Sequence, residues 1–191
     1  MDESSTLPPD AAHVGKRLSE WADDDERVGA MMPDGPRSHG EACWGVLEPT
    51  GLVHRQPPGD AHDGPRDPAE LDAALRLRLT VDSAPLWIMA TLTRFLAMDG
   101  GPPEEFVARA RALADDLVEL LGPEGDWRAN GDYVVRGVRG EGYPPEPLSK
   151  APEGARWSPG GIWVPVTVAP FDAAVVGRGA GHCVVIVRAE A

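Results

Sequence analysis

Residues 173–188 read AAVVGRGAGHCVVIVR, and this stretch decides the fold class. Two runs of small and β-branched apolar residues, 173–176 and 183–188, flank the glycine-rich segment 177–181. β-Branched residues favour strands, and glycine is the usual residue of a tight turn. The glycines lead into a second strand and not into a helix, so they do not form a phosphate-binding loop. We therefore expect an antiparallel hairpin here.

The segment 103–121 is the clearest helix in the chain. Glu104 and Glu105 complement the helix dipole at its start, and Gly122-Pro123 suits its end. Apolar residues recur every three or four positions and form a single stripe, as an amphipathic helix requires. The stripe consists of Phe106, Ala110, Leu113, Leu117, Leu120 and Leu121.

Helical and strand patterns alternate around this helix and predict an α+β domain. Asp67-Pro68 is a typical helix start and predicts one helical turn. A strand over 75–81 is expected to follow, because leucines in this segment alternate with polar residues. Residues 85–98 predict a buried helix, with a strand paired to 75–81 as the alternative. Asn130-Gly131 is a typical hairpin turn and predicts that 127–129 pair with 132–138. The expected fold class is an antiparallel sheet with two to three helices in the middle of the chain.

A Pro/Gly-rich, acidic N-terminal arm or loop region, residues 1–66, is expected to pack on an α+β core domain, residues 67–191. Residues 1–70 hold 15 acidic and 6 basic side chains, which is −9 of the total formal charge of −13. Val14, Leu18 and Trp21 have the spacing of one helix face. Weak strand character over 42–53 predicts two short strands joined by a turn.

The charge and the absence of targeting patterns limit the function classes. A net charge of −13 repels phosphate backbones and anionic lipids, so we expect no nucleic-acid and no membrane partner. The N-terminal residues have neither the basic start nor the apolar core of a signal peptide, and two distant cysteines make no disulfide framework. A cytoplasmic protein is expected. Sixteen Arg against two Lys are typical of a GC-rich bacterial genome.

Cys43, His182 and Asp82 are the catalytic candidates. A cysteine nucleophile needs a nearby base, and His182 at the start of a strand suits that role. The segments around Cys43-Trp44 and His182-Cys183-Val184 resemble those that flank the active site of papain-like cysteine proteases. No Gln closely precedes Cys43 and no Asn follows His182, so the resemblance does not assign the chain to that family. Asp82, before the second predicted helix, is either a helix cap or a catalytic acid.

Metal binding is considered because four potential ligands lie in the first third of the chain. Zinc sites normally use closer ligand pairs on defined turns, whereas proline-rich linkers separate these residues. The sequence therefore predicts no metal and no cofactor. The four residues are His39, Cys43, His54 and His62.

Six residues are candidates for contacts with a ligand or a partner. Tryptophans in segments with little other apolar support often anchor interfaces or line pockets. Arginines on neighbouring strands can form an anion-binding patch if the strands adjoin. The candidates are Trp21, Trp44, Trp157, Arg76, Arg78 and Arg136.

Two functions follow from these candidates. The first is a non-catalytic acidic binding or accessory protein, of an immunity type or from a biosynthetic cluster. It would engage a protein partner or a small-molecule ligand through the Trp-bearing arm and loops, and a homodimer is left open. The alternative is a small enzyme of hydrolase, transferase or cyclase type, in which loops 54–68 and 140–161 close over His182 with Cys43 or Asp82.

Overall fold

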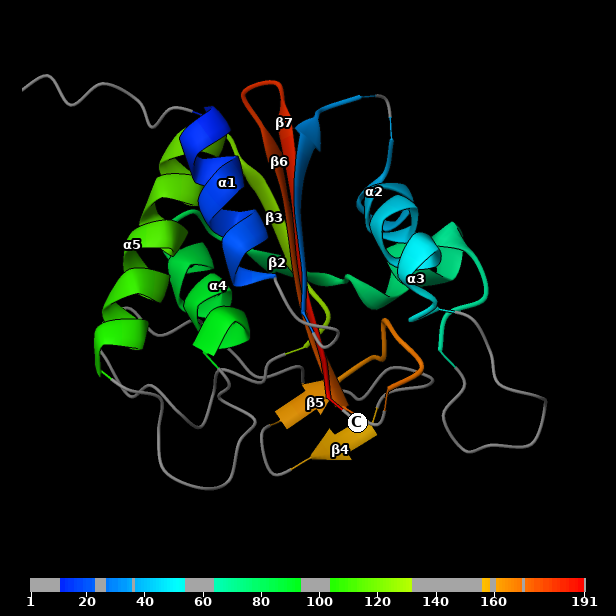
Figure 1. The fold of residues 1–191 in the computed structure, drawn as a ribbon. Helices are drawn as coiled ribbons and strands as arrows, with labels where there is room; N and C mark the ends of the chain where they lie inside the picture. The colour runs from blue at the N-terminus through cyan, green and yellow to red at the C-terminus, as the bar shows by residue number, and fades with distance from the viewer. Residues whose placement is uncertain are drawn as a thin grey trace, which may run out of the picture.

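The central element of the computed structural model is a five-stranded antiparallel sheet with the strand order β1-β7-β6-β3-β2 (Figure 1). A separate two-stranded sheet joins β4 to β5. The strands are β1 (Arg27–Pro33), β2 (Leu77–Leu79), β3 (Asp126–Ala129), β4 (Arg156–Ser158), β5 (Gly161–Trp163), β6 (Phe171–Gly179) and β7 (His182–Glu190). The structure describes residues 11–22, 27–35, 37–53, 64–93, 104–131, 156–158, 161–169 and 171–190.

Helices cover both faces of the sheet, which gives three layers (Figure 1). Helices α1, α4 and α5 pack on one face, called the three-helix side, and α2 and α3 pack on the other, the two-helix side. The general α+β class with an antiparallel sheet is therefore confirmed. The helices are α1 (Ala11–Trp21), α2 (His39–Leu47), α3 (Pro68–Ala74), α4 (Ala84–Thr93) and α5 (Glu104–Leu121), and a 3₁₀ turn (Glu48–Thr50) follows α2.

The predicted hairpin of β6 and β7 is confirmed, and its turn lies at Ala180-Gly181. Both turn residues have positive φ, 44° and 80°, as a two-residue hairpin turn requires. The hairpin is buried on both faces because side chains alternate along each strand. Ala173, Val175, Val184 and Ile186 face the three-helix side, and Ala174, Val176, Cys183, Val185 and Val187 face the two-helix side.

The N-terminal part of the chain contributes to the sheet and to both helical layers. The expected stripe of α1 is confirmed, because Val14, Leu18 and Trp21 are buried against the sheet. Strand β1, which the sequence did not predict, pairs antiparallel with β7 along its length. The arm expected over residues 1–66 therefore supplies an edge strand of the sheet as well as helices that pack on it.

The two strands expected over 42–53 are wrong, because most of this segment belongs to α2 and its 3₁₀ extension. Helix α2 begins with a complete capping box, in which the Ser38 hydroxyl accepts from the Glu41 amide and the Glu41 carboxylate accepts from the Ser38 amide. Such a cap satisfies two backbone donors that a helix start otherwise leaves unpaired. The local hydrogen bonds thus favour a helix.

The hairpin predicted at Asn130-Gly131 is also wrong. Strand β3 pairs with β2 on one edge and with β6 on the other, so no edge remains for 132–138, which lie outside the described residues. The Asn130 side chain is buried and acts as a cross-link instead of a turn residue. Its amide donates to Val164 O and to Asp172 Oδ1, and its oxygen accepts from the Ala174 amide.

The middle of the chain follows the sequence-based expectations closely. Asp67 caps α3 by accepting from the Glu70 amide, and the strand after it is the short β2. Of the two alternatives for 85–98, the structure has the helix: α4 covers the described part of this segment, which ends at Thr93. The apolar stripe of α5 faces the core as predicted, apart from Phe106, which packs at its margin.

Close packing between α2 and α3 yields a test of the fold. A Cβ at Gly40 would lie 2.2 Å from Pro68 O and 2.4 Å from the Asp72 amide nitrogen, whereas a Cβ at Gly45 in the same helix meets nothing within 4 Å. We expect Gly40→Ala to lower the free energy of unfolding by about 1–3 kcal/mol, because the helices must separate. Gly45→Ala should raise it by up to about 1 kcal/mol, because alanine favours helix. Chemical denaturation of both variants measures this, and equal effects would contradict the packing.

Candidate functional site

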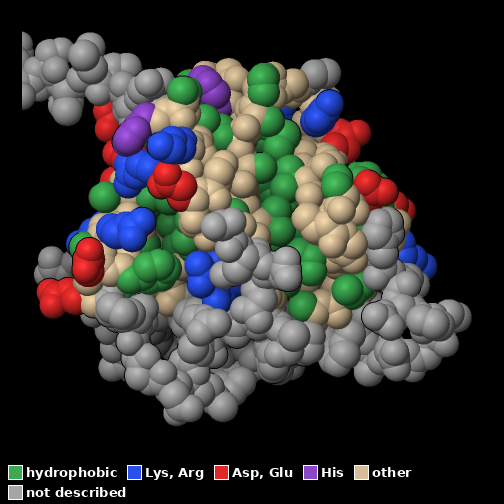
Figure 2. Space-filling model, in the orientation of Figure 1, with side chains coloured by type: hydrophobic (Ala, Val, Ile, Leu, Met, Phe, Trp, Pro, Cys, Tyr) green, Lys and Arg blue, Asp and Glu red, His purple; other side chains and the backbone are tan. Residues whose placement is uncertain are grey.

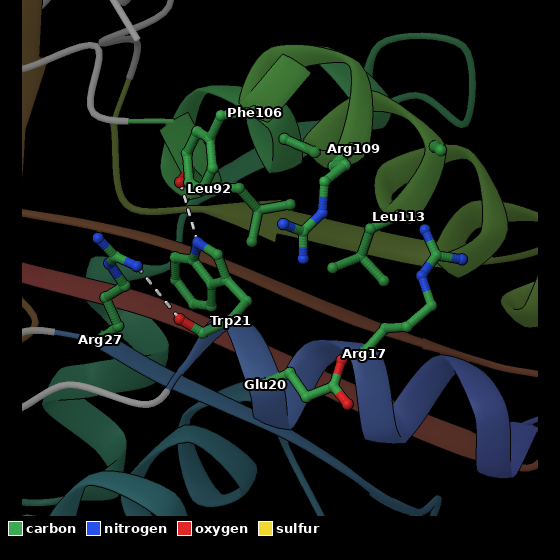
Figure 3. A pocket seen from close by; sticks show the side chains of 10 residues that line it. Arg17, Glu20, Trp21, Arg27, Leu92, Phe106, Arg109 and Leu113 are labelled. Carbon is green, nitrogen blue, oxygen red and sulfur yellow. Dashed lines mark hydrogen bonds between the residues drawn. The ribbon is translucent and has the colours of Figure 1, made fainter. Parts of the chain in front are cut away.

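A pocket of about 300 Å³ lies on the three-helix side, where α1 approaches α5 (Figure 3). Its walls come from four elements: α1, β1, α4 and α5. This volume is at the lower end of the range for small-molecule sites. The lining consists of Arg17, Glu20, Trp21, Arg27, Leu92, Phe106, Arg109, Ala110, Ala112 and Leu113.

Three guanidinium groups reach this pocket from three different elements: Arg17 from α1, Arg27 from β1 and Arg109 from α5. Arg17 pairs with the carboxylate of Asp116 on α5 and so ties the two helices together. Arg27 donates to Trp21 O at 3.4 Å. Its guanidinium carbon lies 5.7 Å from the centre of the Trp21 ring, which is within cation–π range.

Arg109 differs from the other two arginines because no carboxylate among the described residues pairs with it. The residue is exposed, and in Figure 3 its side chain extends from α5 into the space between Phe106 and Leu113. The one carboxylate of the described lining, Glu20, lies 3.6 Å from Lys16 on the outer surface of α1. The pocket therefore carries an excess of positive charge on a chain of net charge −13.

Apolar and aromatic groups form the rest of the pocket wall. The Trp21 indole N–H donates to Leu92 O at 2.9 Å, which holds the ring in one orientation. Trp21 is 9% exposed, so most of the ring packs on the core and one edge borders the pocket. Phe106 and Leu113 contribute apolar surface from α5. The pocket can therefore hold both the charged group and the apolar body of a small ligand.

The structure does not bring Cys43 and His182 together. Cys43 lies in α2 and is fully buried in the cluster on the two-helix side. His182 lines a shallow hollow of about 270 Å³ with residues of α1, so it faces the opposite side of the sheet. Asp82 is exposed in the turn between β2 and α4, and β6 and β3 separate β2 from β7. The three candidates form no common site.

Both thiols are poor nucleophiles in the folded chain. Burial raises the pKa of the Cys43 thiol far above its usual value, and the nearby Asp172 carboxylate adds to the effect. Burial likewise raises the pKa of Cys183 to about 11. Because the thiolate is the reactive form, the two cysteines behave as small buried apolar residues.

Among those of the six predicted binding residues whose side chains the structure describes, only Trp21 lines the pocket. Trp44 is partly buried against the cluster on the two-helix side. Arg76 and Arg78 are exposed around β2, and Arg78 lies 3.8 Å from Asp126. Arg136 and the side chain of Trp157 lie outside the described residues, as does most of the two loops predicted to form lids.

His39 has a structural environment that accounts for its burial. It begins α2, is 4% exposed, and its Nε2 lies 3.0 Å from Asp126 O. Burial lowers the pKa of His39, although the hydrogen bond to Asp126 opposes this shift. The neutral ring therefore links α2 to β3. Within the described part of the chain, no three acidic, histidine or cysteine side chains gather as a metal site would require.

The arginines of the pocket were not predicted, because they come together only through the fold. One signal was present: Arg109 lies three residues after Phe106 and four before Leu113, so it occupies the margin of an apolar stripe. Arg17 similarly precedes Trp21 by one helical turn. A basic residue beside an apolar stripe is common on surface helices, so the signal alone is weak.

A second buried polar group, Asp172, holds the two-helix side together. Its Oδ2 accepts from the Val166 and Thr167 amides and from the Thr167 hydroxyl at 2.8–2.9 Å, and its Oδ1 accepts from Asn130. Burial nevertheless raises the pKa of Asp172 to about 6, because desolvation outweighs these four hydrogen bonds. The carboxylate anchors the segment before β6 and reaches no described pocket.

Comparisons with protein-family models, with curated proteins and with solved structures find no match for this chain. Within the part of the chain that the structure describes, none of the helices combines the length and apolarity needed to cross a bilayer.

Thiol labelling tests the environment of the cysteines. We expect both to react at neutral pH roughly a hundredfold more slowly in the folded chain than in denaturant, because burial raises their pKa and blocks access. Mass spectrometry after timed alkylation measures each site separately. Rapid, selective labelling of Cys43 in the folded protein would contradict the burial.

The raised pKa of Asp172 predicts a pH dependence of stability. The folded state takes up a proton near pH 6, whereas the unfolded chain does so near pH 4, so this group adds stability as the pH falls from about 6 to about 4. The gain is of the order of 1.4 kcal/mol for each unit of pKa shift. Asp172→Asn removes the titration. The free energy of unfolding of the wild type minus that of the variant should therefore increase as the pH falls from about 6 to about 4. A difference that stays constant from pH 4 to pH 7 would refute the assignment.

Proposed function

We propose that this chain is a non-catalytic binding protein that holds a small organic anion in the pocket between α1 and α5. The observation that carries the proposal is the position of Arg109, an arginine without a carboxylate partner among the described residues, beside Trp21 and Phe106. The anionic group, a carboxylate or a phosphate, is assigned to Arg109. The apolar or planar body of the ligand is assigned to the aromatic end of the pocket.

The electrostatics of the pocket support an anion. Guanidinium groups bind carboxylates through paired charge-assisted hydrogen bonds, which are stronger than neutral ones. Arg17 and Arg27 already have partners, so they contribute positive potential and form part of the pocket wall. Arg109 offers guanidinium donors that no described residue occupies. An acidic surface elsewhere repels anions at long range, so anions gain most where arginines are concentrated.

The pre-formed shape of the pocket also supports binding. Trp21 is held by its indole hydrogen bond and by Arg27, and the Arg17–Asp116 ion pair fixes α1 against α5. A pocket whose walls are already ordered loses little conformational entropy when the ligand enters. This is the behaviour of a binding protein that takes up its ligand without large rearrangement.

A non-catalytic role fits the residue types of the described lining. It holds arginines, apolar groups and no cysteine, serine or histidine. Its one carboxylate, Glu20, lies 3.6 Å from Lys16 on the outer surface of α1. His182, Cys43 and Asp82, the residues considered for catalysis, lie elsewhere. The lining resembles a recognition site more than a reaction site in its chemistry.

Binding of matched small molecules tests the proposal. We expect aromatic carboxylates such as benzoate and phenylacetate to bind the full chain in calorimetry and to raise its melting temperature. The isosteric amides should bind roughly tenfold more weakly or worse, because they cannot form charged hydrogen bonds with Arg109.

Two variants on α5 test whether the ligand binds in this pocket. Arg109→Ala should weaken carboxylate binding by roughly tenfold or more, because it removes the guanidinium assigned to the ligand's carboxylate. Arg111→Ala is the matched control, since Arg111 is exposed on the same helix and does not line the pocket. Equal binding of acids and amides, or equal losses in the two variants, would contradict the proposal.

A further inference from the structure

The order of residues along α5 places Arg109 between two different surroundings. Arg109 follows Phe106 by three residues and Asp116 follows Arg109 by seven, so all three lie along one face of the helix. Helix α1 crosses this face with Trp21 toward the Phe106 end and Arg17 at the Asp116 end. An anion at Arg109 therefore has the aromatic end of the pocket on one side and the Arg17–Asp116 ion pair on the other.

Arg17 lines the pocket, but a carboxylate already balances its charge. Its guanidinium pairs with Asp116, and the two side chains are only 27% and 33% exposed. Water and salt therefore screen this pair less than they screen a fully exposed one. Asp116 itself is not part of the described pocket lining. An anion in the pocket thus meets a guanidinium whose field is largely cancelled by its own partner.

The guanidinium of Arg27 is engaged at the aromatic end. It donates to Trp21 O at 3.4 Å, and its central carbon lies 5.7 Å from the centre of the Trp21 ring. In Figure 3, Arg27 and Arg17 lie on opposite sides of Arg109. Arg27 is therefore placed toward the body of the ligand, and Arg17 is the second guanidinium at the charged end.

The surface around the pocket carries charges of both signs. Figure 2 shows basic and acidic side chains on the surface over α1 and α5. The chain as a whole has a net charge of −13. The free energy needed to remove an ion from water rises steeply with its charge, and nearby carboxylates repel a second negative charge. Arg109 alone is therefore suited to an anionic group of one charge.

We propose that the pocket selects anionic groups of a single charge, such as a carboxylate or a sulfate, over the doubly charged phosphate of a monoester. Asp116 sets this preference by holding Arg17. Without that carboxylate, Arg17 would present a second unbalanced guanidinium beside the anion, and two guanidinium groups suit a dianion. This inference rests on the proposed function and narrows its class of ligand. Asp116 is a specificity-determining residue that acts through Arg17.

Phenyl sulfate and phenyl phosphate are matched probes, because they share a ring and a tetrahedral charged group. At pH 8 the sulfate carries one negative charge and the phosphate carries two, since the second pKa of such phosphates is near 6. In calorimetry at constant ionic strength, the full wild-type chain should bind phenyl sulfate roughly tenfold more tightly than phenyl phosphate. This comparison does not depend on the folding of any variant.

The two probes also separate this inference from the proposed function. Phenyl phosphate that binds the wild type as tightly as phenyl sulfate would overturn the selectivity and leave the anion pocket intact. If neither probe binds and no aromatic carboxylate binds, the proposed function fails and the inference fails with it.

Three variants test the role of Asp116. Asp116→Asn should reduce the preference for phenyl sulfate by roughly tenfold, because Arg17 becomes available to the second charge. Asp115→Asn is the matched control, since Asp115 is exposed on the same helix and does not line the pocket. It should leave the preference unchanged. Adding Arg17→Gln to Asp116→Asn removes the released guanidinium and should restore the wild-type preference.

The variants also define what would contradict the role of Asp116. An unchanged preference in Asp116→Asn, an equal change in Asp115→Asn, or a double variant that keeps the reduced preference would each do so. Loss of phenyl sulfate binding in Asp116→Asn would count against it as well, because Asp116 would then act by holding α1 in place.

Discussion

The hairpin of β6 and β7 is the element on which the rest of the structure depends, because both apolar clusters share it as a wall. Each strand has nine residues, and their side chains alternate between the three-helix side and the two-helix side. A change of register by one residue would exchange the two faces and disrupt both clusters. The helices, the edge strand β1 and the pocket at the margin of one layer are all positioned by this pair.

Sequence patterns identified the elements whose signals are local. Helix α5, the hairpin and the stripe of α1 follow from periodicity and turn residues, because their own side chains define the buried face. Strand β1 was missed because its short sequence, RVGAMMP, has no clear alternation, and β7 is what makes it a strand. The Asn130-Gly131 signal misled because the Asn130 side chain satisfies buried groups far along the chain.

The candidate site shows the same division between local and tertiary information. Trp21 was identified because its stripe carried an unusual aromatic residue. The arginines around it lie on α1, β1 and α5, so only the fold brings them together. The pairing of Cys43 with His182 fails because alternation along β7 turns Cys183 toward α2 and His182 toward α1. Sequence reasoning supplied plausible residue types, and the sheet decided which of them meet.

The distribution of charge and burial separates stability from recognition in this molecule. Asp172 and His39 are buried, bonded and enclosed, so they hold elements together. Arg109 is exposed, unpaired among the described residues and placed beside aromatic surface.

The most direct test of ligand binding at Arg109 is a crystal structure of the full chain with the tightest-binding aromatic carboxylate. We predict the carboxylate on Arg109 and the ring against Trp21 and Phe106, and a ligand bound on the two-helix side instead would contradict this account.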